Sequence, residues 1–137
     1  MQLKALDAVK KGDVVLLSPT GSGKTLAFLL PLLGLLDPGI SSVQALILVP
    51  SRELTLQIEQ VFRSIGSGFK VNVCYGGHSV KTELNNLSQP PALLIGTPGR
   101  MAFHLQRENF ATGSVKTLIL DEFDKSLELG FLEEMKF

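Results

Sequence analysis

The sequence predicts an α/β fold with a mainly parallel sheet flanked by helices. Five short apolar runs carry this prediction, at residues 14–17, 45–49, 71–75, 92–95 and 118–120. They consist mostly of Val, Ile and Leu without polar alternation, which is typical of strands buried on both faces. The segments between them are long enough for the crossover helices that parallel strands require. The repeated β-α order therefore favours one parallel sheet over residues 1–137.

Length and composition set further limits. The chain has 137 residues, of which 45% are hydrophobic and 19% charged, so it is one folded domain rather than a disordered, collagenous or coiled-coil chain. Its single cysteine, Cys74, excludes a disulfide framework and favours the reducing cytoplasm. Thirteen basic and thirteen acidic residues leave no net charge, so any nucleic-acid binding must use a local basic surface.

One apolar stretch, residues 26–36, resembles the core of a signal peptide. It is shorter than the roughly 20 residues that span a bilayer, and it contains Pro31 and Gly34. We therefore expect no targeting or membrane segment, and we expect this stretch to be the buried helix behind the loop at residues 18–25.

Two helices have clear start signals. Ser51 can cap the first, and Gly66 suits its C-terminal stop. Thr97 can cap the second, with Pro98 in its first helical position. The apolar residues of the first helix recur at helical spacing: Leu54, Ile58, Val61, Phe62 and Ile65.

A glycine-rich loop of the kind that binds phosphates follows the first apolar run. Gly21 and Gly23 let the backbone curl so that successive amides, reinforced by the following helix N-terminus, point at phosphate oxygens. Lys24 is expected to contact the β- and γ-phosphates, and Thr25 to offer its hydroxyl to Mg²⁺. An ordinary βα turn with a solvated lysine is the structural alternative. The predicted nucleotide-binding residues are Ser18, Pro19, Thr20, Gly21, Ser22, Gly23, Lys24 and Thr25.

Two adjacent acids end the last predicted strand, at the sheet edge where ligands bind in open α/β folds. Neighbouring residues on a strand point in different directions. Asp121 can therefore hold the Mg²⁺ shell while Glu122 orients and deprotonates an attacking water. Acidic strand ends alone are also explained by solubility. Together with the phosphate loop they predict a nucleoside triphosphatase whose catalytic residues are Lys24, Asp121 and Glu122.

Three more loops are expected at the same edge. The segments 50–54 and 96–100 each place a hydroxyl residue and an arginine at a helix N-terminus, an arrangement suited to phosphodiesters. A glycine pair after another strand permits close backbone approach. The alternative is that the hydroxyls only cap helices and the arginines are solvated. The recurrence favours a polymer-backbone surface made of Pro50, Ser51, Arg52, Gly76, Gly77, Thr97, Pro98, Gly99 and Arg100.

With these motifs in this order, the chain resembles the N-terminal RecA-like domain of DEAD-box RNA helicases across nearly its whole length. SPTGSGKT resembles the family's motif I, PSRELTLQ its motif Ia, Gly76-Gly77 its GG element and TPGR its motif Ib. The segment DEFD, residues 121–124, stands where the family has Asp-Glu-Ala-Asp, and LGF at 129–131 is also similar. The resemblance implies a RecA-like P-loop NTPase fold, present here as a partial domain.

The resemblance implies ATP and Mg²⁺ as cofactors and single-stranded or duplex RNA, contacted through its backbone, as partner. It also implies that Gln2 reads the adenine and that Asp124 couples the site to motif III. For Gln2 an ordinary solvated residue is the alternative, because the family's upstream aromatic is absent. Three positions depart from the common pattern: Ser18 replaces a glycine, Ser51 a threonine, and Phe123 the alanine of the tetrad.

Four further residues are expected to have structural roles. His78 and His104 lack metal-ligand spacing, so we expect them to be solvated or packed. Tyr75 and Phe103 are expected to pack in the core, with stacking on bases as the alternative.

A small-molecule kinase, a DNA-directed translocase and a non-catalytic RNA-binding fragment are the alternative functions. The last stays open because the family's motif III and second RecA-like domain, with its arginine finger, would follow Phe137. In the sheets that the chain resembles, the motif III strand separates the strand leading into Ser18 from the strand ending at Asp121. We expect these two strands to flank a gap or to close on each other. We also expect the chain alone to bind nucleotide weakly, hydrolyse it negligibly and unwind no duplex.

Overall fold

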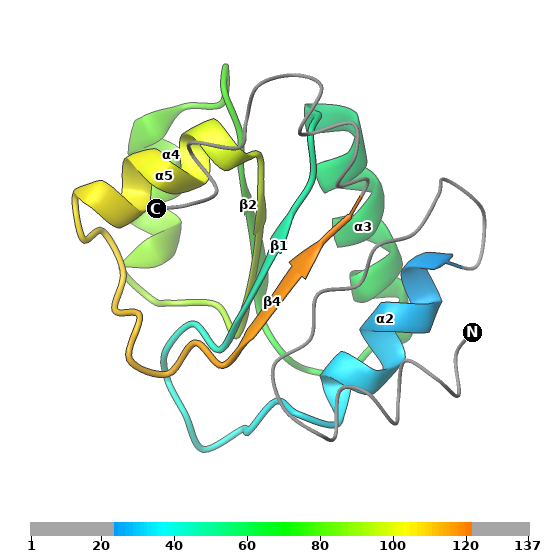
Figure 1. The fold of residues 1–137 in the computed structure, drawn as a ribbon. Helices are drawn as coiled ribbons and strands as arrows, with labels where there is room; N and C mark the ends of the chain where they lie inside the picture. The colour runs from blue at the N-terminus through cyan, green and yellow to red at the C-terminus, as the bar shows by residue number, and fades with distance from the viewer. Residues whose placement is uncertain (1–23, 122–137) are drawn as a thin grey trace.

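The computed structural model describes residues 24–121, which form a parallel sheet between two layers of helices (Figure 1). The strands of this part are β1 (Ala45–Leu48), β2 (Val71–Cys74), β3 (Leu93–Gly96) and β4 (Thr117–Leu120). Its helices are α2 (Lys24–Leu33), α3 (Arg52–Ile65), α4 (Val80–Leu87) and α5 (Pro98–Gln106). The predicted α/β class with a parallel sheet is confirmed.

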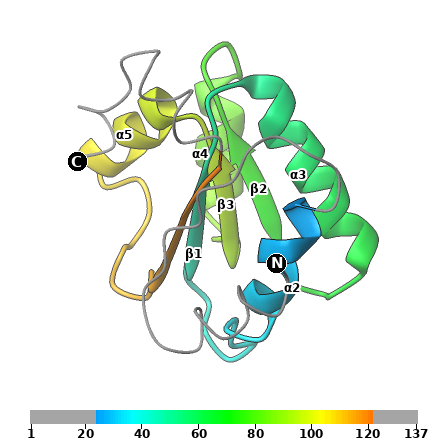
Figure 2. The ribbon, with the colours of Figure 1, turned by 45° about the vertical axis from the view of Figure 1, so that its right-hand side comes forward.

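The strands lie in the order β2-β3-β1-β4, and each neighbouring pair is parallel. Leu48 at the end of β1 stands opposite Gly96 and Leu120, the last residues of β3 and β4. Helices α2 and α3 cover one face of the sheet, and α4 and α5 cover the other (Figure 2). Because all the strands run the same way, their carboxyl ends share one edge.

The four apolar runs within residues 24–121 are all strands, and their observed ends differ from the predicted ones by at most one residue. The predicted strand at 14–17 lies outside the described residues, so the expected gap beside the strand that ends at Asp121 stays a prediction. One expectation was wrong in part: Leu118 of β4 is 37% exposed rather than buried. Among the described strands β4 lies at the sheet edge and pairs only with β1, so fewer neighbours cover it.

Side chains alternate between the two faces of the sheet, and both faces are apolar. Ala45 and Ile47 of β1 pack into the cluster beneath α2 and α3, together with Phe62. Leu46 and Leu48 pack into the opposite cluster, which includes Met101 of α5. This two-sided burial explains why the strands lack polar alternation.

The first predicted helix has the predicted ends. Ser51 precedes α3, and its hydroxyl accepts a hydrogen bond from the Leu54 amide at 3.3 Å. Gly66 ends the helix with φ 70°, a left-handed conformation that glycine adopts without strain.

Helix α2 is buried on one side only. Phe28, Leu29 and Leu32 are buried as expected, but Leu30 is 47% exposed, so the expected buried helix is buried on one face only. No helix within residues 24–121 is both long and apolar enough to cross a bilayer.

Gly96 fills a position at the end of β3 where a side chain does not fit. A Cβ atom built there would lie 2.6 Å from the Cys74 sulfur, 2.7 Å from the Cys74 carbonyl oxygen and 3.1 Å from the Met101 methyl. The first two contacts are far inside van der Waals separation, and one of them is to backbone. The missing side chain therefore lets β2, β3 and α5 approach one another where the loops of the site begin.

We expect Gly96→Ala to lower the free energy of unfolding by about 1–3 kcal/mol, the usual range for overpacking. Urea denaturation followed by circular dichroism measures this. Gly113→Ala is the matched control, because a Cβ at Gly113 meets nothing within 4 Å. Equal stability of the two variants would contradict the close approach described here.

Candidate functional site

The shared carboxyl edge of the sheet gathers the loops that the sequence singled out. Pro50, Ser51 and Arg52 follow β1, Gly76 and Gly77 follow β2, residues 97–100 follow β3, and Asp121 follows β4. Helix α2 points its first turn toward the same edge (Figure 1). The remaining predicted site residues lie outside the described part: Gln2, Ser18, Pro19, Thr20, Gly21, Ser22, Gly23, Glu122 and Asp124.

The described part of the predicted nucleotide site comes from α2 and β4. Lys24 is the first residue of α2 and Thr25, partly buried, is the second. Asp121 is 5% exposed, and its amide donates a hydrogen bond to the Leu48 carbonyl at 2.9 Å. This bond ties the start of the acidic segment to the end of β1, the neighbouring strand.

At the start of α3, Ser51 caps the helix and Arg52 is solvated, as the structural alternative in the sequence analysis expects. The Ser51 hydroxyl caps the helix. The Arg52 side chain is 59% exposed, and a guanidinium nitrogen lies 3.9 Å from a Glu53 carboxylate oxygen, a long contact between exposed groups. Such a pair contributes little to stability, which leaves the guanidinium accessible from solvent.

The glycine pair after β2 forms a tight turn. The His78 amide donates to the Tyr75 carbonyl at 3.1 Å, and Gly77 has φ 90°. The tyrosine ring packs against the core beneath α3 and stacks on the His78 ring, with centroids 4.7 Å apart, so the expected packing role of Tyr75 is confirmed. Gly76 and Gly77 are exposed at the tip of the turn.

The start of α5 differs from that of α3. Thr97 stands at the N-cap and Pro98 in the first turn, as predicted, but the Thr97 side chain makes no capping hydrogen bond. The capping explanation of this hydroxyl is therefore wrong. Thr97 is partly exposed and Gly99 is exposed, whereas Pro98 is buried, so the first turn of α5 meets solvent mainly at Gly99.

The Arg100 side chain is mostly buried and hydrogen-bonded within the protein. Its side chain is 14% exposed, and Nη1 donates to Glu83 Oε1 at 3.0 Å and to the His78 carbonyl at 3.1 Å. The alternative of a solvated arginine is wrong here, and contact with a polymer backbone remains a prediction.

Glu83 of α4 is the centre of this cluster, with a side chain that is 1% exposed. Its Oε1 accepts hydrogen bonds from Arg100 Nη1 at 3.0 Å and from His104 Nε2 at 2.7 Å. Its Oε2 accepts from the Tyr75 amide at 3.1 Å and from His78 Nδ1 at 2.7 Å. The carboxylate thus joins α4, α5 and the turn after β2.

The histidines of the cluster are packed rather than solvated. His104 is fully buried, and the Asn109 amide nitrogen lies 2.9 Å from its Nδ1. An amide that donates to Nδ1 leaves the ring proton on Nε2, where it points at Glu83. His78 is 23% exposed. No group of three or more His, Cys, Asp or Glu suited to hold a metal occurs in the described range 24–121.

Burial and hydrogen bonding act on the Glu83 carboxyl in opposite directions. Burial alone would raise its pKa, but hydrogen bonds from His104, His78, the Tyr75 amide and Arg100 outweigh it and hold the pKa below its usual value of 4.5. The carboxylate is therefore ionised at neutral pH, and Arg100 supplies the compensating charge.

Phe103 of α5 is partly buried and belongs to neither apolar cluster, so the expected core packing of this ring is wrong. The Arg107 guanidinium carbon lies 3.9 Å from the Phe103 ring centroid, and that of Arg100 lies 5.5 Å away. Cation–π stacking of this kind is favourable even at exposed sites. The Phe103 ring therefore contacts the guanidinium of Arg107, the residue that follows α5.

Sequence reasoning missed Glu83. A glutamate in the first turn of a polar helix is usually explained by the helix dipole. The available signal was the combination of this glutamate with His78, Arg100 and His104, but their sequence separations of 5, 17 and 21 residues reveal no contact until the fold is known.

Glu83→Gln should weaken the acid dependence of stability. Because the pKa of Glu83 is lowered in the folded state, its contribution is present above the unfolded value of 4.5 and is lost as the pH falls through the folded value. The wild type should therefore exceed the variant in free energy of unfolding at pH 7, and the difference should shrink below about pH 4. Urea denaturation at a series of pH values measures both curves. Parallel curves would contradict the assignment.

Comparison with known proteins gives consistent results along the whole chain. The family model described as DEAD/DEAH box helicase matches residues 1–137. The ATP-dependent RNA helicase CshA of Limosilactobacillus reuteri is 37% identical over 139 residues, covering 99% of this chain and 28% of the relative. The ATP-dependent RNA helicase eIF4A of Botryotinia fuckeliana is 41% identical, covering 98% of this chain and 35% of the relative.

A solved structure shares the fold. The crystal structure of a hypothetical ATP-dependent RNA helicase from Sulfolobus tokodaii superposes with a TM-score of 0.84 at 32% identity, covering 98% of this chain and 40% of that one. This chain thus spans well under half of the length of the relatives it matches. Because the family model matches the chain from its first residue to its last, the protein belongs to the DEAD/DEAH box helicase family.

Proposed function

We propose that this chain is the ATP-binding part of an ATP-dependent RNA helicase, which couples ATP binding and hydrolysis to RNA binding and duplex unwinding. One observation carries the proposal: the four parallel strands of the described part end at one edge, where each is followed by a segment suited to phosphates or metal. The relatives named above are ATP-dependent RNA helicases, which supports the choice of substrates.

The nucleotide half of the proposed site lies between α2 and β4. The proposed phosphate contacts are Lys24 and the loop before it, and the proposed Mg²⁺ contacts are Thr25 and Asp121. A hydroxyl and a carboxylate fit Mg²⁺, which prefers oxygen ligands and keeps several waters. Bound Mg²⁺ would neutralise charge on the phosphates, while Glu122 would orient the attacking water.

The RNA half lies across the ends of β1, β2 and β3. Its exposed elements are Arg52, the Gly76-Gly77 turn and the first turn of α5. Helix N-termini and backbone amides favour anions of any sequence. We therefore propose contact with the backbone of single-stranded or duplex RNA, with Thr97, Gly99 and Arg100 as contributors from α5.

RNA-stimulated hydrolysis also needs, in our proposal, motif III and the second RecA-like domain that the motif resemblance implies. The chain spans 28% and 35% of two relatives, which agrees with this division of labour. We propose the cytoplasm as the compartment. The one cysteine, Cys74, is buried and free, which is compatible with a reducing compartment.

ATPase rates measured without polymer, with RNA and with DNA separate the proposal from its alternatives. The measurement uses the chain extended with motif III and the second RecA-like domain of a relative, because we expect the chain alone to turn over negligibly. Stimulation by RNA supports a helicase, and stimulation by DNA alone a translocase. Turnover that depends on a small acceptor molecule indicates a kinase.

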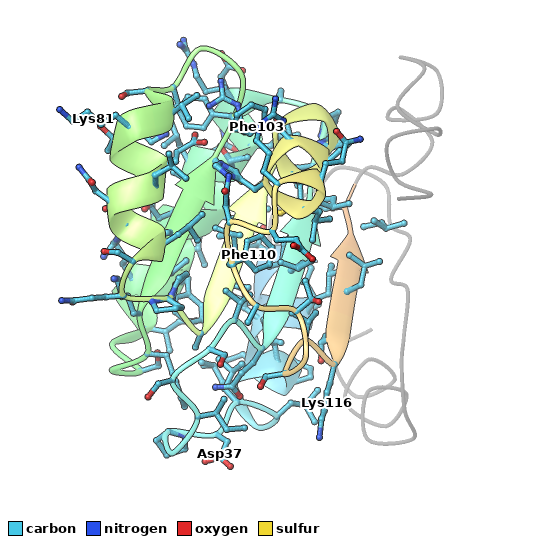
Figure 3. All side chains as sticks on the ribbon, turned by 90° about the vertical axis from the view of Figure 1, so that its left-hand side faces the viewer. Asp37, Lys81, Phe103, Phe110 and Lys116 are labelled. Carbon is cyan, nitrogen blue, oxygen red and sulfur yellow. The ribbon has the colours of Figure 1, made fainter. Side chains whose placement is uncertain are left out.

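Lys24→Ala should abolish nucleotide binding while the fold stays intact. The lysine supplies a point charge to the phosphates, whereas glycines shape the loop backbone. Fluorescent ATP-analogue titration and circular dichroism measure binding and folding. Lys116→Ala is the control, since Lys116 lies at the opposite end of the sheet from Phe103 and the start of α5 (Figure 3). Equal analogue affinity for the Lys24 variant and the wild type would refute the phosphate-loop assignment.

Arg52→Ala should weaken binding to RNA homopolymers of different bases about equally. Loss of one phosphate contact should also flatten the plot of log affinity against log salt by about one unit. Arg63→Ala is a matched control, because Arg63 lies on the same helix, at its other end, with 58% exposure against 59% for Arg52. A loss confined to one base sequence would argue against backbone contact. Arg100→Ala is a less clean test because it also removes a partner of buried Glu83.

A further inference from the structure

We propose that Glu83 is a positioning residue for RNA binding: its carboxylate holds the Gly76-Gly77 turn and the N-terminal turn of α5 in one fixed arrangement on the RNA surface. The inference rests on the proposed function, since it concerns the same surface. Glu83 itself is 1% exposed, so it acts through the groups that it binds.

The two segments that Glu83 joins come from different places in the chain. The turn follows β2, and α5 follows β3, its neighbour in the sheet. Helix α4 connects the two strands, and it lies beside α5 on one face of the sheet (Figure 3). A side chain of α4 can therefore reach both segments.

Each carboxylate oxygen of Glu83 serves one segment. Oε2 accepts from the Tyr75 amide and from His78, which bracket the glycine pair. Oε1 accepts from Arg100 and His104, one helical turn apart on α5. Arg100 adds a second link, because its Nη1 also donates to the His78 carbonyl at 3.1 Å. The two segments are thus held to each other as well as to α4.

A carboxylate suits this cluster better than an amide of the same size, because both of its oxygens accept hydrogen bonds. Four N–H donors converge on Glu83, so both of its oxygens must accept. A glutamine has one accepting oxygen and one donating nitrogen. Whichever way its amide turns, the nitrogen faces either the Tyr75 amide or the Arg100 guanidinium, which can only donate, so one of the two segments loses a hydrogen bond.

The arrangement also determines how Arg100 is presented. A guanidinium has five N–H groups in a rigid plane. Within residues 24–121, the hydrogen bonds of Arg100 run through Nη1. Two hydrogen bonds from Nη1 fix the orientation of the guanidinium plane. The remaining N–H groups of Arg100 therefore keep a constant orientation next to the first turn of α5. The same bonds leave 14% of the side chain exposed, which is the part that a phosphate can reach.

The test compares Glu83→Gln with the wild type and with Glu59→Gln, which removes a carboxylate ion-paired with Arg63 on α3. The readouts are affinity for an RNA homopolymer at several salt concentrations and affinity for a fluorescent ATP analogue. We expect Glu83→Gln to lower RNA affinity about tenfold or more, as loss of one charge-assisted contact does, with the salt slope reduced by about one. We expect its nucleotide affinity to stay within about twofold, because α2 and β4 lie apart from the cluster. Glu59→Gln should change neither.

Two outcomes overturn the inference. If Glu83→Gln binds RNA as tightly as the wild type, Glu83 does not position the surface, although the proposed function stands. If RNA and nucleotide affinity fall together, Glu83 has only a general structural role. A wild type without salt-dependent RNA binding would instead refute the proposed function itself, and this inference with it.

A second variant keeps the test valid if Glu83→Gln fails to fold. His78→Phe keeps an aromatic ring to stack on Tyr75 but removes the donor to Oε2. His78 is 23% exposed, so the substitution leaves the core intact. We expect reduced RNA affinity with unchanged nucleotide affinity. Unchanged RNA affinity in a folded His78→Phe protein would overturn the inference.

Discussion

Parallel strand pairing is the constraint on which the described part of the molecule depends. Parallel strands need crossover connections, and helices covering both faces of the sheet supply them here. Both faces are then filled by apolar side chains, so polar chemistry is confined to the loops. Because every strand ends at the same edge, segments far apart in sequence, such as Arg52 and Asp121, reach that edge together.

Glu83 is the main exception to the apolar packing beneath α4 and α5. A buried carboxylate is unfavourable unless hydrogen bonds and an opposite charge replace its hydration. Four N–H donors and the Arg100 guanidinium do so here. The hydrogen bonds of such a cluster require specific donor and acceptor directions, whereas apolar contacts permit two helices to shift along each other. Glu83 therefore gives α4 and α5 a defined register that packing of Leu87 and Met101 alone would not impose.

Features that depend on local sequence were predictable. The strands were found because burial on both faces leaves continuous apolar runs, and α3 because Ser51 and Gly66 mark its ends. The grouping of the loops at one edge followed from the parallel topology. What local sequence could not show was the pairing of distant polar groups.

The same limit explains the errors at individual residues. The alternative of a solvated Arg100 was wrong, because the fold brings Glu83 beside it. Thr97 looked like a cap, but its hydroxyl makes no capping bond. Leu118 looked buried because the apolar run gives no indication of strand order, and β4 is an edge strand of the described sheet. Side-chain partners and strand order are both long-range properties.

The strand order also has a consequence for how the chain folds. β1 lies between β3 and β4, so Ala45 pairs with Leu93 and with Thr117, both far ahead in the sequence. During synthesis β1 leaves the ribosome long before either of its two neighbours in the described sheet exists. Contacts over such separations form slowly, because the intervening loop must close first. A nascent chain that ends before β3 therefore exposes the apolar strand that the described sheet later pairs on both sides, a form on which chaperones act.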